Sequence, residues 1–347
     1  ITSAGDNGVS VVATGGNITT GATLTANTSA IAPVLLKATA NILVNNALQS
    51  SGGAVTLWAD SDETAQGGIL MAAGSSIVSN GGDVTLGGGN GATAADGYAK
   101  ATASITESTG GVYSGIRLVG TITAGAGDVI LRGQDSALVG TTSHSTGIET
   151  TKASFVKTTT GSISLDGALS TGVTGTGNHI GILLGWGGTA ESGTNVVSSD
   201  SGAISLTGSS STLANAKGWG LWLAGSNVTS TSGNITLTSN GNAANTTEFI
   251  FAAGAVTSTS GAVLLKTSST PGTATFTSGS LNSDASVTVQ AYAPTVTALT
   301  LGGSGAKVFE SPNGTDSFAS AFSNANLTTS STSSSVRNCV VKSCNHF

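Results

Sequence analysis

The chain consists of short runs in which apolar and small polar residues alternate, and each run is bounded by Gly, Ser or Asn. Residues 219–237, WGLWLAGSNVTSTSGNITL, hold three such runs: GLWLAG, NVTS and GNITL. Alternation with a period of two over a few residues is the pattern of a β-strand with one buried face. Because no two-residue turn of the Asn-Gly kind separates the runs, we expect a coil of strands rather than a hairpin.

The same three-strand unit recurs along the chain. Its third strand, Gly-x-Val/Ile-x-Leu, has copies that begin at Gly53, Gly82, Gly127, Gly161, Gly202, Gly233 and Gly261. Its first strand has copies at 68–71, 115–118, 181–184, 220–223 and 248–251. The spacing inside a unit is nearly constant, apart from one unit stretched at 186–199, whereas the spacing between units varies. That combination is typical of a solenoid whose insertions collect at particular corners.

This repeat predicts an all-β fold, a right-handed parallel β-helix. Each strand would pair with its counterpart one coil away, at about 4.8 Å, and alternate residues would point inward as ladders of Val, Ile and Leu. The handedness follows from the general preference for right-handed crossovers. We expect about 12–15 coils and a rod of about 60–70 Å. A β-sandwich is the alternative, but it requires tight hairpins that the pattern lacks.

The repeats divide the chain in two. Residues 1–293 are interpreted as the β-helix, and 294–347 as terminal coils or a cap followed by a Ser/Thr-rich tail. Within the second part, 316–325 has Phe and Ala at helical spacing, which predicts either a short amphipathic helix or another degraded coil. The tail would be ordered by pairing as an added strand.

Three further stretches stand apart from the repeat. The variable segments 87–111 and 140–157 are expected to be surface loops or extra strands laid beside the rod. Cys339 and Cys344, near the C-terminus, are a candidate local disulfide in an oxidising compartment, with free thiols and inter-chain bridges as alternatives.

Alternation also assigns the outward-facing positions. In the third strand these are mostly hydroxyl residues, as a solvated face should be: Thr56, Thr85, Ile130, Ser164, Ser205, Thr236 and Leu264. In the first strand they are mostly large and apolar: Leu70, Arg117, Leu183, Trp222 and Ile250. An exposed apolar stripe usually marks a contact surface, so this column is our candidate assembly or partner face. The alternative is that a long insertion covers it.

The ends of the rod raise a related expectation. The first and last coils of a β-helix present unpaired strand edges, and residues 1–25 already read as strands without a clear cap. Head-to-tail stacking is therefore physically natural, and a head-to-tail contact that does not close into a ring produces an open fibre.

Composition narrows the class of protein. Hydrophobic residues make up 38% of the chain and charged residues only 8%, so a core is available and disorder is not expected. The net charge of -6, without a basic cluster, argues against nucleic-acid binding. No run of 18 apolar residues is present, so we expect no membrane insertion. The chain begins at Ile1 without a signal-peptide pattern, and we interpret it as a processed product or a fragment.

Candidate chemistry is sparse. The acidic residues are scattered, and the one dense patch, 60–63 (Asp-Ser-Asp-Glu), is read as a solvated corner or a weak cation site. His144, His179 and His346 are far apart without metal-ligand spacing. The glycine-rich run 87–91 lacks the Lys-Ser/Thr of a phosphate-binding loop. We therefore expect no catalytic, cofactor-binding or metal-binding residues, no cofactor, and no enzyme activity.

Two other patterns have alternative readings. Thr-x-Thr pairs do not recur at one register, which argues against an ice-binding surface. Trp186, Trp219 and Trp222 have the side chains that stack on sugars, but packing is the preferred interpretation because Trp219 shares the inward parity of Leu221.

The repeat resembles a known class of proteins. The cassette GIxLxGxxVxSxSGxITL, together with VLLKATANILVNN and GGAVTLWADSDE, resembles the repeat body of filamentous-haemagglutinin-like exoproteins over roughly residues 10–292. That family consists of large β-helical adhesins secreted or displayed by bacteria. The resemblance implies an extracellular or cell-surface location and a structural or adhesive role without enzyme activity.

Two functional hypotheses follow. In the first, the protein is an extracellular filament subunit whose partners are other copies of itself. In the second, it is a non-enzymatic adhesin rod that binds a host or surface glycan. A carbohydrate-active β-helix enzyme is a distant third. Fibres would distinguish the first from the second.

Overall fold

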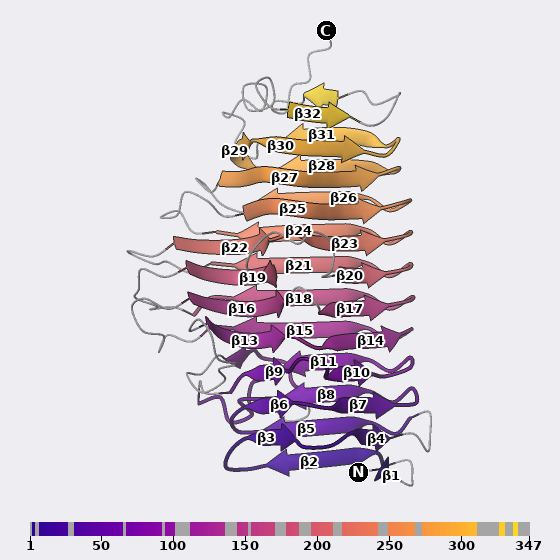
Figure 1. Ribbon diagram of the computed structural model, residues 1–347, viewed down its shortest axis with the longest axis vertical. Coiled ribbons are helices and arrows are strands. Elements are labelled where there is room, and N and C mark those ends of the chain that lie inside the picture. Colours follow the sequence, from indigo (N-terminus) through magenta and orange to yellow (C-terminus); the bar gives the residue numbers. More distant parts are fainter. Residues whose placement is uncertain are drawn as a thin grey trace.

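The computed structural model describes most of the chain. The described residues are 2–3, 7–26, 31–64, 67–91, 94–100, 112–135, 144–151, 154–170, 178–186, 196–210, 217–241, 249–267, 273–310, 326–329 and 336–338. Among them there is no helix, and the strands form two sheets that run the length of a stack of coils (Figure 1). Strands β2 and β31 lie near opposite ends of that stack (Figure 1).

Sheet A, the larger sheet, has 20 strands. They are β1 (Thr2–Ser3), β3 (Ile18–Thr20), β4 (Leu24–Ala26), β6 (Ile42–Val44), β7 (Ala47–Ser50), β9 (Ile69–Met71), β10 (Ser76–Val78), β13 (Val112–Leu118), β14 (Thr121–Gly125), β16 (His144–Thr151), β17 (Phe155–Thr158), β19 (Asn178–Trp186), β20 (Val196–Ser199), β22 (Lys217–Leu223), β23 (Ser226–Ser230), β25 (Phe249–Ser258), β27 (Thr273–Ser283), β29 (Tyr292–Val296), β30 (Ala298–Gly302) and β32 (Asn326–Thr329).

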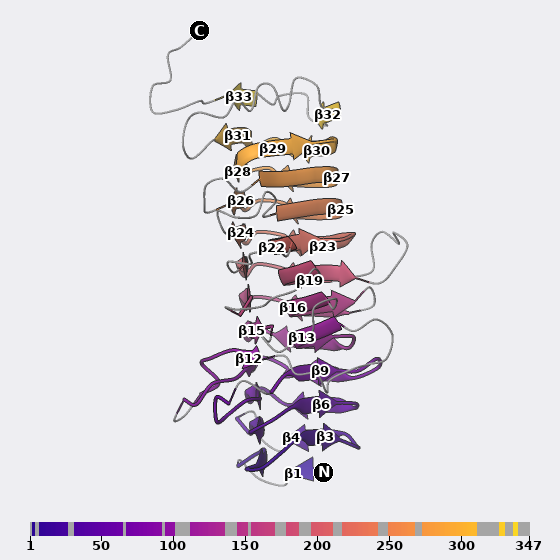
Figure 2. The ribbon, with the colours of Figure 1, turned by 90° about the vertical axis from the view of Figure 1, so that its left-hand side faces the viewer.

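Sheet B has 13 strands and forms the other wall of the coils (Figure 2). They are β2 (Val9–Ala13), β5 (Val34–Ala38), β8 (Val55–Trp58), β11 (Val84–Gly87), β12 (Ala99–Lys100), β15 (Val129–Gln134), β18 (Ile163–Ala168), β21 (Ile204–Ser209), β24 (Ile235–Asn240), β26 (Val263–Thr267), β28 (Ser286–Gln290), β31 (Ala306–Glu310) and β33 (Val336–Asn338). From β5 onward, each strand except β12 stacks on the third strand of the coil before it.

The strands pair in parallel with their counterparts in the neighbouring coils. In sheet B, Ile163 lies opposite Ile204, which lies opposite Ile235. Equivalent positions of successive repeats therefore lie next to each other in the sheet. The predicted all-β parallel β-helix is confirmed. The outward hydroxyl column is in register too, since Thr85 pairs with Thr56 on one side and with Ile130 on the other.

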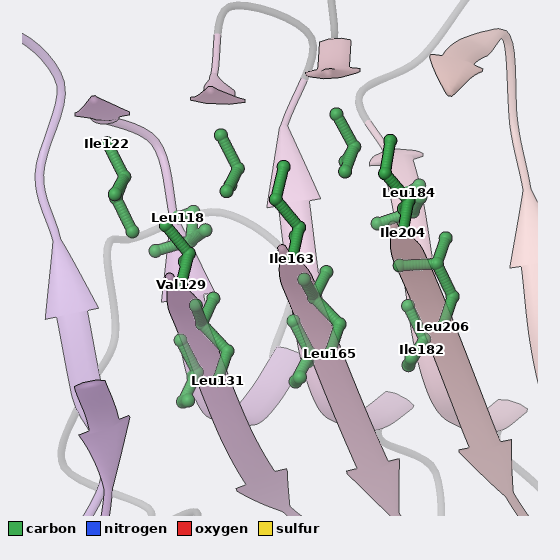
Figure 3. Packing of buried hydrophobic residues seen from close by; sticks show 14 of the residues in the cluster. Leu118, Ile122, Val129, Leu131, Ile163, Leu165, Ile182, Leu184, Ile204 and Leu206 are labelled. Atoms are coloured by element: carbon green, nitrogen blue, oxygen red, sulfur yellow. The ribbon is translucent and has the colours of Figure 1, made fainter. Parts of the chain in front are cut away.

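One continuous apolar core fills the space between the two sheets. Figure 3 shows Ile163 and Leu165 of sheet B and Ile182 and Leu184 of sheet A, whose side chains share this space. All four are at most 1% exposed. Alternate residues of every coil add to the core in this way, so apolar burial stabilises the stack along its whole length.

The glycine that opens each third strand has a packing reason. A Cβ atom at Gly202 would lie 1.9 Å from the carbonyl oxygen of Gly161, and one at Gly233 would lie 2.0 Å from that of Gly202. Successive coils approach too closely at this corner for any side chain. The recurring glycine is therefore required by coil spacing and not by an unusual backbone angle.

A buried hydroxyl three residues earlier completes the same corner. Ser199 accepts a hydrogen bond from the Gly202 N–H at 2.8 Å, and Ser230 accepts one from the Gly233 N–H at 2.9 Å. The resulting Ser-x-x-Gly corner satisfies backbone groups that would otherwise be buried without partners. The repeat cassette in the sequence already contains this serine, three residues before the glycine, but the pattern alone did not assign it a role.

The two variable segments differ from each other. The described part of 87–111 lies beside the rod as predicted: β12 pairs with β15, and Trp58 Nε1 donates to the Gly89 carbonyl at 2.6 Å. The prediction for 140–157 is wrong. It contains β16 and β17, which pair in register with β13 and β14, so it is a regular coil. The repeat pattern did not reveal this coil because Glu149 and Thr150 stand where the first strand of other units has apolar residues.

The coils continue past the predicted end of the repeat region. Residue 293 lies inside β29, and the next strands, β30 and β31, pair with β27 and β28. The predicted helix at 316–325 lies outside the described residues, as do Cys339 and Cys344.

Candidate functional site

The candidate assembly face is a single column of residues. Leu70 lies opposite Arg117 on neighbouring strands, and Trp222 lies between Leu183 and Ile250. The predicted register is therefore confirmed.

The two parts of the column are joined by a residue that sequence reasoning missed. Glu149 of β16 lies between Arg117 and Leu183. The signal that would have found it is the Gly-Ile pair at 147–148, which matches the start of the first-strand repeat.

The column is largely covered. Leu70 is 4% exposed and Leu183 is 2% exposed, whereas Arg117, Trp222 and Ile250 are half-buried. The expectation of an exposed stripe is therefore wrong at the two leucines, as the alternative of a covered face anticipated. Parity along a strand shows which side of the sheet a residue takes, but not what else packs against that side.

Glu149 belongs to a buried polar network on this face. Its carboxylate accepts a hydrogen bond from Ser114 Oγ at 2.9 Å and lies 3.5 Å from Arg117 Nε. Thr146 Oγ1 donates to Ser114 Oγ at 2.7 Å. Burial raises the pKa of Glu149, while Arg117 and the Ser114 hydrogen bond act in the opposite direction.

Two tryptophans of β22 form an aromatic pair on the same face. The ring centroids of Trp219 and Trp222 are 5.2 Å apart with an interplanar angle of 68°, an edge-to-face contact. Residues three apart on a straight strand point to opposite faces, so the strand must bend between them. The ladder between β19 and β22 skips Gly220, since Trp219 pairs with Ile180 and Leu221 pairs with Ile182. The inward parity predicted for Trp219 is therefore wrong, although its side chain does pack, against Trp222 outside the apolar core.

A second buried polar cluster joins sheet B to sheet A. Asp135 follows β15, Ser145 lies on β16, and His179 lies on β19. Ser145 Oγ donates to Asp135 Oδ2 at 2.7 Å and lies 2.5 Å from His179 Nδ1, while that nitrogen is 3.9 Å from Asp135 Oδ2. Burial raises the pKa of Asp135, and hydrogen bonds from Ser170 and Ser145 oppose that shift.

This cluster contains the residue types of a hydrolytic triad in a different geometry. In a triad the imidazole lies between the carboxylate and the nucleophile. Here the serine lies between the carboxylate and the imidazole. All three side chains are at most 1% exposed, so the serine hydroxyl is not presented to a substrate. The arrangement holds strands together rather than performing acyl transfer.

The acidic patch at 60–63 is split between interior and solvent. Asp62 and Glu63 are exposed, in agreement with a solvated corner. Asp60 is fully buried, has a φ of 48°, and lies 3.5 Å from Lys100 Nζ, so the solvated interpretation is wrong for this residue. The ion pair ties the 94–100 segment to the coil beneath it.

The histidines and acidic residues do not gather as metal ligands. His144 belongs to β16 and His179 to β19, while His346 lies outside the described residues. In the described part of the chain, no group of three or more His, Cys, Asp or Glu residues is placed to hold a metal ion. Nor do these residues include any helix with the length and apolar character needed to cross a bilayer.

The first coil opens into an apolar cavity of about 300 Å³. Its lining consists of Val11, Ile18, Thr19, Thr20, Gly21, Ala22, Leu24 and Leu36. These residues come from the strands β2, β3, β4 and β5 and from the turn after β3. Within the described residues β2 pairs with β5 alone, which leaves its outer edge available for another strand. Among the described residues, the apolar cavity thus lies beside the edge of β2 that faces away from β5.

Known proteins offer no match. No protein-family model, no curated protein and no solved structure matches the chain.

Proposed function

We propose that the protein is a non-enzymatic structural β-solenoid that self-assembles head to tail into an extracellular filament. The observation that carries this proposal is the first described coil, where the apolar cavity adjoins an edge of β2 with which no described strand pairs. An open parallel edge beside an apolar cavity is a template for another coil of the same cross-section.

The chain itself supplies such coils. The contact between neighbouring coils is repeated along the rod, with Val, Ile and Leu stacked on their counterparts. A terminal coil from a second copy would cover the cavity and the half-buried Val11 in the same way, whereas Ile18 and Leu24, at 7% and 5% exposed, are already buried within the chain. Because the two surfaces in such a contact differ, it does not close on itself and produces an open fibre.

Lateral association has weaker support. Its candidate face is the column from Leu70 to Ile250, and the two leucines of that column are already buried within the chain. An extracellular location is supported by the resemblance of the repeat to filamentous-haemagglutinin-like exoproteins. A structural rather than enzymatic role is supported by the burial of the cluster of Asp135, Ser145 and His179, which contains nucleophile, imidazole and carboxylate.

Electron microscopy and sedimentation velocity over a range of protein concentrations test this proposal. We expect rods longer than one chain, with a population that grows with concentration. Val11→Asp, which puts a charge into the cavity, should shorten the rods to single chains. Thr159→Asp, at an exposed corner, is the matched control and should leave assembly unchanged. Single rods at every concentration would contradict head-to-tail assembly.

A glycan-binding adhesin is the second candidate, favoured by the half-buried pair of Trp219 and Trp222. Aromatic rings on a protein surface stack on the apolar faces of sugars. Binding to an array of glycans that is lost in Trp219→Ser, together with single rods in the microscope, would favour this function over the filament.

A further inference from the structure

Buried polar side chains gather on both faces of β16. Ser145, on one face, contacts Asp135 and His179. The next residue, Thr146, points to the other face, where it joins the network of Ser114 and Glu149. Elsewhere in the described coils, most buried polar side chains are hydroxyls, and the buried ionisable residues Asp60 and Lys307 occur singly, so this concentration of ionisable groups is particular to β16.

The two carboxylates oppose the stability of this coil when they are charged. Asp135 is 1% exposed and Glu149 is fully buried. Removing a carboxylate from water costs free energy that hydrogen bonds and a partly exposed guanidinium offset only in part. The raised pKa of each carboxyl group reports the same imbalance, with burial as the largest cause in both cases.

We propose that β16 is an acid-strengthened latch in the rod: its coil opens most readily near neutral pH and is held more tightly as the solution becomes acidic. The device goes beyond the proposed filament function and does not depend on it. It requires only that the two buried carboxyl groups on either face of β16 take up protons while the coil stays closed.

The sign of the effect follows from linkage. Consider a carboxyl group whose pKa is higher in the folded state than in the open state. At pH values between these two pKa values, the folded state binds more protons than the open state does. Within that window, stability therefore increases as pH falls, and the gain is complete below the pKa of the open state. The usual acid loss of stability, caused by carboxyl groups with lowered pKa, has the opposite sign.

Several groups face the two carboxyls, and their hydrogen bonds and charge oppose the effect of burial without reversing it. Asp135 is faced by Ser145 of β16, His179 of β19 and Ser170 after β18. Glu149 is faced by Arg117 and Ser114 of β13, and Arg117 remains charged throughout.

Hydrogen exchange of the full chain, read by mass spectrometry and corrected for the intrinsic pH dependence of exchange, tests the latch. Peptides covering 144–151 should gain protection between pH 7.5 and pH 5, by on the order of tenfold for each pKa unit by which a carboxyl is raised. Peptides covering β24 provide the internal reference, because no ionisable side chain of that strand is buried.

Neutral isosteres isolate the cause. Asp135→Asn and Glu149→Gln should each reduce the pH dependence of protection at 144–151, and the double variant should abolish it. Asp284→Asn, which removes an exposed carboxyl distant in sequence, should leave it intact. Protection of β16 that is constant or falls on acidification of the wild-type chain would overturn the proposal, as would a pH dependence that survives in the double variant.

Discussion

The hydroxyl of Ser258 donates a 2.7 Å hydrogen bond to the carbonyl oxygen of Gly233, in the preceding coil, and accepts one from its own coil at the Gly261 N–H. One buried side chain thus links two coils and closes the corner between β25 and β26. The coils are held together here by a side-chain hydrogen bond in addition to the backbone ladder.

Removal of this hydroxyl should destabilise the rod. Ser258→Ala leaves a buried N–H and a buried carbonyl without their partner, a loss of about 1–3 kcal/mol. A decrease in the midpoint of urea unfolding checks it. Ser260→Ala removes an exposed hydroxyl two residues away, which donates to the Thr231 carbonyl at 3.2 Å, and should change the midpoint little. Equal effects of the two substitutions would argue against a special role for the corner.

The corner glycines should tolerate no side chain. In Gly202→Ala the new Cβ would meet a backbone carbonyl at 1.9 Å, and only a displacement of one coil from the next would relieve the clash. We expect a loss of about 3 kcal/mol or more, at the upper end of the overpacking range, measured as a fall in melting temperature. Gly15→Ala is the control, because a Cβ atom there meets nothing within 4 Å. A Gly202→Ala protein that melts like the control would show that the coils are not so closely spaced.

Near the C-terminal end of the described coils, Lys307 donates the hydrogen bonds that a hydroxyl supplies at the other corners, although it lies on a strand and not at the corner itself. It follows Val287 in the inward column of sheet B and is 1% exposed. Its ammonium donates to the carbonyl oxygens of Ser283, Gly303 and Gly305, at 3.1, 3.2 and 2.7 Å. Three backbone carbonyls thus depend on one buried cation.

Lys307→Met should therefore destabilise the terminal coils although it makes the core more apolar. The three carbonyls would lose their donor, and we expect a loss of about 1–3 kcal/mol. Limited proteolysis should detect it as faster cleavage after residue 290. Lys266→Met, on the half-buried outward column, is the matched control and should cleave at the wild-type rate. Slower cleavage of Lys307→Met would mean that burial of the methionine outweighs the lost hydrogen bonds.

The tryptophan pair should behave as one energetic unit. A double-mutant cycle with Trp219→Ala and Trp222→Ala, measured by urea unfolding, should yield a coupling energy of about 0.5–1.5 kcal/mol, as expected for an edge-to-face contact. The sum of the single effects would then exceed the effect of the double substitution. Additive effects would mean that the rings are adjacent without interacting.

Most of the coil architecture was predictable from sequence. In a parallel stack each residue pairs with its own counterpart, so a repeated Gly-x-Ile-x-Leu fixes strand, register and inward face together. Prediction failed where that repetition is broken by polar residues. β16 was read as a loop because Glu149 and Thr150 interrupt the apolar pattern, although hydrogen bonds and an ion pair replace the missing apolar contacts.

By itself the sequence determined that the chain is an all-β parallel solenoid, and it placed Leu70, Arg117, Leu183, Trp222 and Ile250 in one outward column, because strand parity and repeat spacing are local properties. Only the tertiary structure decided which members of that column are covered. It also decided that Trp219 turns toward Trp222, and that Asp135 and Glu149 are buried with partners from other coils. Those outcomes depend on segments that are distant in sequence and adjacent in space, and no local pattern encodes such contacts.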